Sequence, residues 1–130
     1  MMKTGDQFEV AYVVDERLYD GFIQLFNDKN PLHVDETFAR EKGFESKVMH
    51  GAILNGFLSN FIGEQLPVKN VVVQSYKISF MKPVYMGTTL KLTAKITDVF
   101  DSVNCILFKF KFENSAAIAV AKGEISIGLI

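Results

Sequence analysis

The sequence predicts an α+β domain in which an antiparallel sheet of about five strands curls around one long buried helix. Residues 50–66 place apolar side chains on most sides of a helix, which is typical of a helix buried in a core. After Pro67 the apolar period changes from 3.6 to 2, the period of strands with one buried face. A chain of 130 residues, 48% of them hydrophobic, can build one core, so we expect residues 1–130 to form a single domain.

The N-terminal part is expected to contain a strand, a helix and two tight segments. Residues 7–14 are rich in Val, Tyr and Phe, which favours a first strand. Asp15 is a suitable helix N-cap, and apolar residues follow it at helical spacing as far as about Phe26. A turn from Asp28 to His33 comes next, and residues 35–40 favour a short helical turn.

The remaining chain predicts the long helix and four further strands. The helix is expected to begin at His50 and to end at Pro67, which cannot continue a helix. Alternating apolar and polar residues predict strands over residues 75–80, 90–97, 106–112 and 119–127. The last strand carries small side chains on one face, including Ala121 and Gly123, and these are expected to let the sheet approach the helix closely.

Composition excludes several classes of protein. The net charge is −1 and both signs are scattered, so neither a nucleic-acid-binding stripe nor an acidic tail is present. Cys105 is the only cysteine, which excludes an internal disulfide and a cysteine-based zinc site. The N-terminus lacks the apolar segment of a secretory signal, and no segment is apolar enough to span a membrane. A soluble cytoplasmic protein that binds neither nucleic acid nor membrane is therefore expected.

The segment from Asp28 to His33 carries the candidate chemistry. It places an acid and an imidazole five residues apart, separated by the rigid pair Asn30-Pro31, so the two side chains can share one water molecule. Asn30 can brace the turn through an Asx-type hydrogen bond. Gly51 follows His50 near the start of the long helix, where free backbone N–H groups point outward and a ligand carbonyl can approach. This set of groups suits proton transfer next to a carbonyl.

Plainer interpretations exist for each of these residues. An Asp-x-Asn-Pro sequence is a common turn, and His50 can be a residue that merely lies near a helix cap. Ser59 can bond a backbone carbonyl one turn back in the helix. A metal site formed by His33, Asp35 and His50 is disfavoured, because their spacing matches no known zinc pattern and leaves Asp28 unexplained.

The run Asp28-Lys29-Asn30-Pro31-Leu32-His33, followed after five residues by Ala39, resembles the signature of the MaoC-like dehydratases. The branch it resembles most is that of the (R)-specific enoyl-CoA hydratases. The likeness extends over roughly residues 10–98 and includes His50-Gly51, Ser59, Leu66-Pro67 and residues 80–87. Two departures stand out: Asn27 replaces a small residue before Asp28, and Thr88-Thr89 replaces an acidic residue after Gly87.

The resemblance implies a hot-dog fold and the reversible addition of water to a 2-enoyl thioester, which gives a (3R)-hydroxyacyl thioester. It implies that Asp28 is the base, that His33 orients the water and passes a proton to C2, and that the Gly51 N–H stabilises the oxyanion. Ser59 is expected to bond and orient Asp28, with Asn30 and His50 in supporting positions. No metal and no redox cofactor is expected, since the thioester itself makes C2 acidic.

Several alternatives share this site. A 3-hydroxyacyl dehydratase acting in the reverse direction on an acyl-carrier protein has the same residues, whereas a hot-dog thioesterase or a non-catalytic binding module leaves the Asp28 and His33 pair unexplained. The substrate is expected to be an acyl-CoA or an acyl-carrier-protein thioester of fatty acid metabolism, and a homodimer is expected. Phe57 and Phe61 are assigned to the core rather than to an acyl tunnel. Four lysines are weak candidates for phosphate contacts, namely Lys77, Lys82, Lys109 and Lys111.

Overall fold

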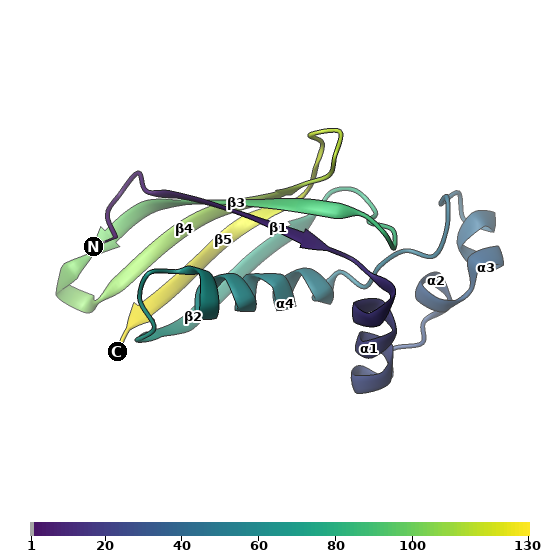
Figure 1. The fold of residues 1–130 in the computed structure, drawn as a ribbon, viewed down its shortest axis with the longest axis horizontal. Coiled ribbons are helices and arrows are strands. Elements are labelled where there is room, and N and C mark those ends of the chain that lie inside the picture. The colour runs from purple at the N-terminus through teal and green to yellow at the C-terminus, as the bar shows by residue number, and fades with distance from the viewer. Residues whose placement is uncertain (1) are drawn as a thin grey trace.

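Five antiparallel strands form one sheet, in the order β1-β3-β4-β5-β2, in the computed structural model, which describes residues 2–130 (Figure 1). The strands are β1 (Gln7–Val13), β2 (Val71–Phe80), β3 (Thr89–Phe100), β4 (Cys105–Glu113) and β5 (Ala119–Leu129). The three C-terminal strands pair consecutively, β1 adds to β3 at one edge and β2 adds to β5 at the other. The predicted five-stranded antiparallel sheet is confirmed.

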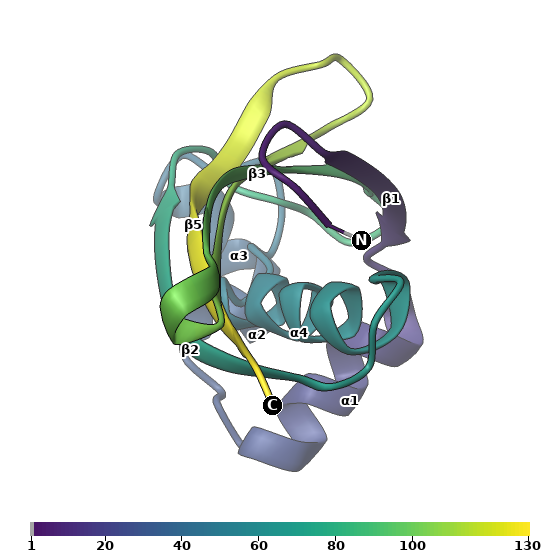
Figure 2. The same ribbon diagram turned by 90° about the vertical axis from the view of Figure 1, so that its left-hand side faces the viewer.

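The sheet curls over a single helix, as the turned view of the ribbon shows (Figure 2). This helix, α4 (Ala52–Asn60), continues into one π-helical turn, η1 (Phe61–Gln65), so the predicted continuous helix has two parts. The two parts end before Pro67, as predicted, and the Lys69 ammonium donates to the backbone carbonyls of Gly63 and Glu64 at 3.2 and 2.9 Å. These bonds satisfy carbonyl groups that a helix end leaves free.

The core lies between α4 and the inner face of the sheet. Leu54, Leu58 and Phe61 of the helical segment are fully or nearly fully buried, and the Phe61 ring meets Phe108 of β4 edge to face at 5.9 Å. Phe57 stacks on Tyr12 of β1 at 4.5 Å. Burial of each such side chain contributes roughly 1.5–3 kcal/mol, so the helix is held mainly by packing against the sheet. These contacts support the assignment of Phe57 and Phe61 to the core.

The structural role of Gly123 in β5 differs from the role that the sequence predicts. A Cβ added to it would lie 1.7 Å from the backbone oxygen of Lys77 in β2. The expectation that this glycine brings the sheet close to the helix is therefore wrong, because the close neighbour is the adjacent strand. The glycine lets β2 take its place at the edge, and the end of β2 lines the site described below.

Three helices project from one end of the sheet and precede α4 (Figure 1). They are α1 (Glu16–Phe26), α2 (Pro31–Val34) and α3 (Glu36–Glu41). Asp15 caps α1 through a 2.8 Å bond from the Leu18 N–H, as predicted. Asn27 ends α1 with a left-handed φ of 56°, a conformation that asparagine tolerates better than most residues. The unusual Asn27 thus directs the chain out of α1 towards Asp28.

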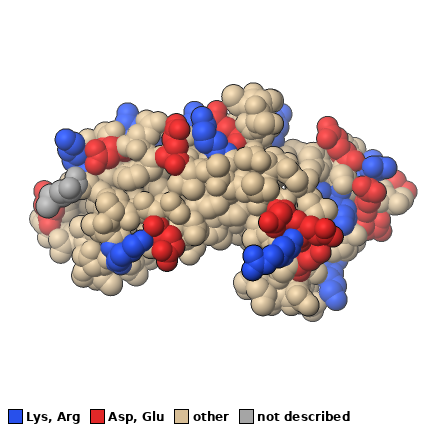
Figure 3. Space-filling view, viewed as in Figure 1, with Lys and Arg blue, Asp and Glu red and all other residues tan. Residues whose placement is uncertain are grey.

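The surface carries charges of both signs, interspersed over the face that Figure 3 shows. Only three ion pairs occur in the described part of the chain, and all involve at least one well-exposed side chain. Exposed pairs of this kind contribute little to stability, so electrostatics does not determine the fold. None of the helices within residues 2–130 has both the length and the apolarity needed to cross a membrane.

Candidate active site

Asp28, His33 and His50 meet at the N-terminal end of α4. The potential ligand atoms of their side chains all lie within 4.8 Å of one another. The imidazole rings of His33 and His50 stack with centroids 3.9 Å apart and an angle of 26°. The predicted proximity of Asp28 and His33 is thus present, and His50 joins them from a segment 17 residues further along the chain than His33.

The turn that carries the acid and the imidazole is held by its own side chains. The Asn30 Oδ1 accepts a 3.0 Å bond from the Leu32 N–H and caps α2, with Pro31 in its first turn. The Asp28 Oδ1 accepts a 3.2 Å bond from the Asn30 N–H. The Asx-type brace predicted for Asn30 is therefore confirmed, and the Asp28 carboxylate stays exposed at the surface of the single chain.

The orientation of His33 fixes its tautomer. Its Nδ1 lies 2.7 Å from the backbone oxygen of Val48, which can only accept a hydrogen bond, so Nδ1 carries a proton. In the neutral ring Nε2 then keeps a free lone pair. The Val48 N–H also donates to the Leu32 carbonyl at 3.0 Å, so the segment before α4 and the helix α2 hold each other in register.

His50 is buried and holds the backbone of Asp28 through a hydrogen bond. It is only 2% exposed, and its Nε2–H donates to the Asp28 backbone oxygen at 2.9 Å. Its ring packs between His33 and Phe22, whose ring centroid lies 4.6 Å away. His50 therefore does more than sit near a helix cap, because it ties the turn of Asp28 to the start of α4.

Gly51 is the N-cap residue of α4, and among the described residues no acceptor takes its N–H. The absence of a side chain matters here, because an added Cβ would lie 2.8 Å from the ring of Phe80 at the end of β2. A free N–H at the start of a helix, where the backbone dipoles add, suits a developing negative charge. The predicted oxyanion donor is thus available.

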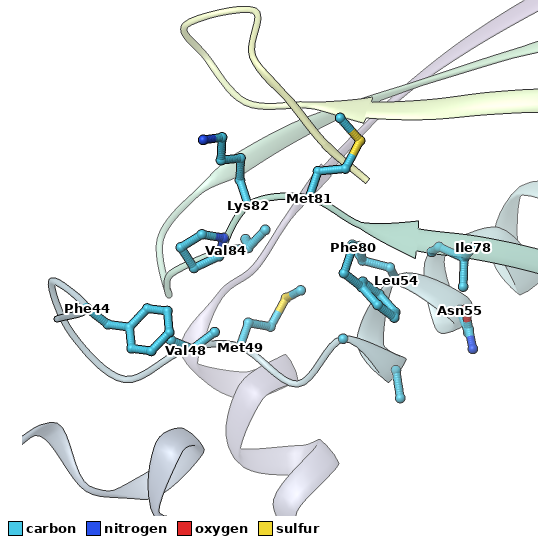
Figure 4. Close-up of a pocket in the computed structure, with 13 residues that line it drawn as sticks. Phe44, Val48, Met49, Leu54, Asn55, Ile78, Phe80, Met81, Lys82 and Val84 are labelled. Atoms are coloured by element: carbon cyan, nitrogen blue, oxygen red, sulfur yellow. The ribbon is translucent and has the colours of Figure 1, made fainter. Parts of the chain in front are cut away.

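Two cavities flank this first turn of α4. One, of about 600 Å³, is lined by the start of α4 and by the end of β2, including Gly51, Ile78 and Phe80 (Figure 4). The other, of about 530 Å³, is lined by α1 and α4, and Asp28 lies on its wall. Ala52 and Asn55 line both cavities, so this turn of the helix forms the ridge between them.

Ser59 does not reach Asp28. It is exposed on α4, and no hydrogen bond joins it to Asp28 within residues 2–130. Ser59 lies one helical turn beyond Asn55, and it lines neither the cavity that has Asp28 on its wall nor the other cavity of the site. The expected bond from Ser59 is wrong for this structure, and Asn55, one turn after Gly51, is the polar residue that shares a cavity with Asp28.

Tyr19 is a buried part of the site that sequence reasoning missed. It is 1% exposed, and its hydroxyl donates to the His33 carbonyl at 2.6 Å and approaches the Val48 carbonyl at 3.1 Å. The only sequence signal was a tyrosine on the apolar face of α1, and the partners lie 14 and 29 residues away. Burial, together with the charge of Asp20, raises the pKa of Tyr19 to about 12, so the hydroxyl remains a donor at neutral pH.

Replacing Tyr19 with phenylalanine is expected to lower the free energy of unfolding at pH 7 by about 1 kcal/mol, the usual net value of a hydrogen bond. Because its folded pKa of about 12 exceeds the ordinary value of 10, the stabilising effect of this phenol is complete below pH 10 and is lost as the pH rises towards 12. Urea unfolding at a series of pH values checks this. The difference between the two proteins should shrink above pH 10, and equal stability at pH 7 would contradict the prediction.

A metal ion fits these residues poorly. An imidazole binds a metal in the plane of its ring, but the rings of His33 and His50 are stacked at 26°, so their lone pairs run side by side instead of converging. Asp35, the third member of the set considered from the sequence, accepts a 3.0 Å bond from the Phe38 N–H and caps α3. The arrangement suits a hydrogen-bonded water molecule better than a cation.

A family of known proteins shares sequence similarity with this chain. A family model described as MaoC like domain matches residues 3–111. An (R)-specific enoyl-CoA hydratase of Rhodospirillum rubrum is 28% identical over 108 residues, covering 83% of this chain and 75% of that protein. An (R)-specific enoyl-CoA hydratase of Aeromonas caviae is 36% identical over 76 residues, 58% of this chain and 57% of that protein. A mitochondrial 3-hydroxyacyl-[acyl-carrier-protein] dehydratase of Arabidopsis thaliana is 27% identical and covers 95% of this chain and 75% of its own length.

Solved structures agree with the fold. The (R)-hydratase from A. caviae involved in PHA biosynthesis superposes with a TM-score of 0.90 at 24% identity, covering 99% of this chain and 98% of that chain. An unliganded R-hydratase from Pseudomonas aeruginosa gives a TM-score of 0.89 at 24% identity, covering 98% and 82%. At these identities the likeness concerns the fold, and the predicted hot-dog architecture is confirmed.

Proposed function

The chain belongs to the MaoC-like domain family, and from this premise we propose that it is an (R)-specific enoyl-thioester hydratase. The relatives are named hydratases and dehydratases, which are hydro-lyases, and the chain is an enzyme of this class. The observation that supports the finer assignment is the convergence of Asp28, His33 and His50 within 4.8 Å at the N-terminal end of α4, the end at which the Gly51 N–H is free.

The proposed reaction adds water reversibly to the double bond of a 2-enoyl thioester, with both new bonds on one face. The water oxygen bonds to C3, one of its protons leaves for Asp28, and C2 receives a proton through the Asp28 and His33 pair. The product is the (3R)-hydroxyacyl thioester. His33 can take part in this proton transfer because its Nδ1–H donates to the Val48 backbone oxygen, which leaves the Nε2 lone pair free. Positioned acid–base groups of this kind contribute roughly 10²- to 10⁴-fold in rate.

Negative charge collects on the thioester oxygen while the water adds. In this proposal the Gly51 N–H binds that oxygen, and the helix start strengthens the bond through its dipole. The N–H is fixed by the backbone before the substrate arrives, so no reorganisation is needed during the reaction. The stacked histidines and the Asn30 brace hold the other reacting groups in the same way. Neither a metal nor a redox cofactor has a step in this reaction.

The test is the ultraviolet absorbance of the conjugated enoyl thioester. Purified protein should bleach crotonyl-CoA or hexenoyl-CoA, and chiral analysis should find the (3R)-hydroxy product. Release of free thiol instead would indicate a thioesterase. A chain that leaves several CoA lengths and an acyl-carrier-protein substrate untouched, while still binding them, would be a binding module and the proposal would fail.

A 3-hydroxyacyl-acyl-carrier-protein dehydratase is the second candidate, favoured by the likeness to the plant mitochondrial dehydratase. The site is the same and the reaction runs in the opposite direction. The rates with matched CoA and carrier-protein thioesters decide between the two substrates. Of the four lysines considered for phosphate contacts, Lys82 lines the larger of the two cavities, so it is the one retained for this role. A cytoplasmic location stays a prediction.

We also propose a homodimer. The edge strand β2 exposes apolar side chains at Val72, Tyr76 and Phe80, which are 46%, 39% and 57% exposed. An edge strand with such side chains pairs readily with another chain, and a second copy would extend the sheet across it. Light scattering should give twice the chain mass, and a monomer at micromolar concentration would count against the dimer.

A further inference from the structure

Two buried side-chain polar atoms in the described chain have no hydrogen-bond partner, and both lie at the start of α4. They are the His50 Nδ1 and the Asn55 Oδ1. Buried polar atoms are nearly always satisfied, because an unmade bond destabilises the fold. An unsatisfied buried atom of a residue that lines a cavity is therefore a candidate ligand contact. His50 lines neither of the two cavities of the site, whereas Asn55 lines both.

The surroundings of Asn55 narrow what it can bind. It lies one helical turn after Gly51, the proposed oxyanion donor, and it shares a cavity wall with Asp28, the proposed base. Its neighbours on the ridge and along the larger cavity are apolar, as Leu54 and Ile78 show (Figure 4). A substrate group that reaches Asn55 would therefore be polar and would lie between a carbonyl bound at Gly51 and the acid–base pair.

We propose that Asn55 binds the oxygen on C3, accepting a hydrogen bond from the O–H that this oxygen keeps. This inference rests on the proposed function. Water brings two O–H bonds to the reaction: one proton leaves for the Asp28 and His33 pair and ends on C2, and the other stays on the oxygen now bonded to C3. Asp28 and the His33 Nε2 are occupied with the migrating proton, so the retained O–H needs a separate acceptor. The Asn55 Oδ1 is buried and unpartnered, and Asn55 lines the cavity that has Asp28 on its wall.

The decisive measurement compares two ligands that differ only at C3. In an Asp28→Asn background, which prevents turnover, calorimetry gives the Kd of (3R)-hydroxybutyryl-CoA and of butyryl-CoA. Asn55→Leu should weaken the hydroxy ligand about tenfold, the value of one hydrogen bond, and leave butyryl-CoA unchanged. An equal change for both ligands, or no change, overturns the inference, because a packing role would not distinguish them.

Turnover gives a second readout in the otherwise unaltered enzyme. The Asn55→Leu variant should lose about tenfold in kcat by the same factor for crotonyl-CoA and hexenoyl-CoA, because both carry the same oxygen at C3. A loss that depends on chain length would show that Asn55 contacts the acyl tail, and would overturn the inference while leaving the hydratase function intact. An unaltered enzyme with no hydratase activity would instead refute the function itself.

Asn60 supplies a matched control on the same helix. Its Oδ1 has a partner, the Tyr12 hydroxyl at 2.8 Å. Asn60→Ala should lower the Tm and leave both affinities unchanged, whereas Asn55→Leu removes an unsatisfied atom and should not lower the Tm. If the leucine variant does not fold, Asn55→Ala removes the same oxygen without added bulk and is judged by the same ligand comparison.

Discussion

Asp28→Asn is expected to abolish nearly all hydration of crotonyl-CoA, with kcat reduced by about 10²- to 10⁴-fold and the fold unchanged. The amide cannot accept the proton that the attacking water must lose. It keeps the Oδ1 that accepts the Asn30 N–H, so the turn that positions His33 remains in place. The His50 bond to residue 28 also remains, because it reaches the backbone oxygen. Stopped-flow absorbance and a thermal melt measure the two quantities.

Asp35→Asn is the matched control for this experiment. Asp35 is also an exposed carboxylate whose Oδ1 accepts a backbone N–H, from Phe38 at 3.0 Å, and it lies only seven residues away. The substitution makes the same change of charge and keeps the same cap, so activity should stay within about twofold. An Asp28→Asn enzyme that is as active as the Asp35→Asn enzyme would show that Asp28 is not the base.

The fold was predictable because one pattern governs most of the chain. The local spacing of apolar residues is enough to predict β3, β4 and β5, where apolar and polar residues alternate. It is also enough to predict the apolar helix before Pro67. The start of β2 was missed: it begins at Val71 and not at residue 75, because the register shifts between Val73 and Ser75 and breaks the alternation. A bulge of this kind depends on the neighbouring strand, which the sequence of β2 does not reveal.

The site divides into a local part and a distant part. Asp28, Asn30 and His33 lie within six residues, and their Asx bonds follow from turn chemistry, so the sequence predicted them. Tyr19 and Asn55 depend on how α1 and α4 pack, and their contacts span long distances in the chain. The predicted bond from Ser59 to Asp28 failed for the same reason. The resemblance to the family identified Ser59 as a site residue, but it did not show where Ser59 lies relative to Asp28.

Removing the Gly51 N–H is expected to lower kcat by about 10²- to 10³-fold, the usual effect of losing one oxyanion donor. Proline is the substitution that does so: Gly51 has a φ of −56°, which proline adopts, and its N–H makes no bond within the described chain. The added ring would strike Phe80, since even a Cβ would lie 2.8 Å from it. The variants of Gly51 are therefore made and compared in a Phe80→Ala background, which removes this ring.

In that background Gly51→Ala adds bulk and keeps the N–H, whereas Gly51→Pro adds bulk and removes it, so the ratio of their kcat values isolates the donor. The ratio should be about 10² to 10³, with KM much less affected, because the charge on the thioester oxygen develops mainly in the transition state. Proline also restricts His50, the residue before it, and equal melting temperatures for the two variants would show that the bond from His50 to Asp28 persists. Equal kcat values for alanine and proline would mean that the oxyanion is stabilised by another group, and the start of α4 would lose its role in the reaction.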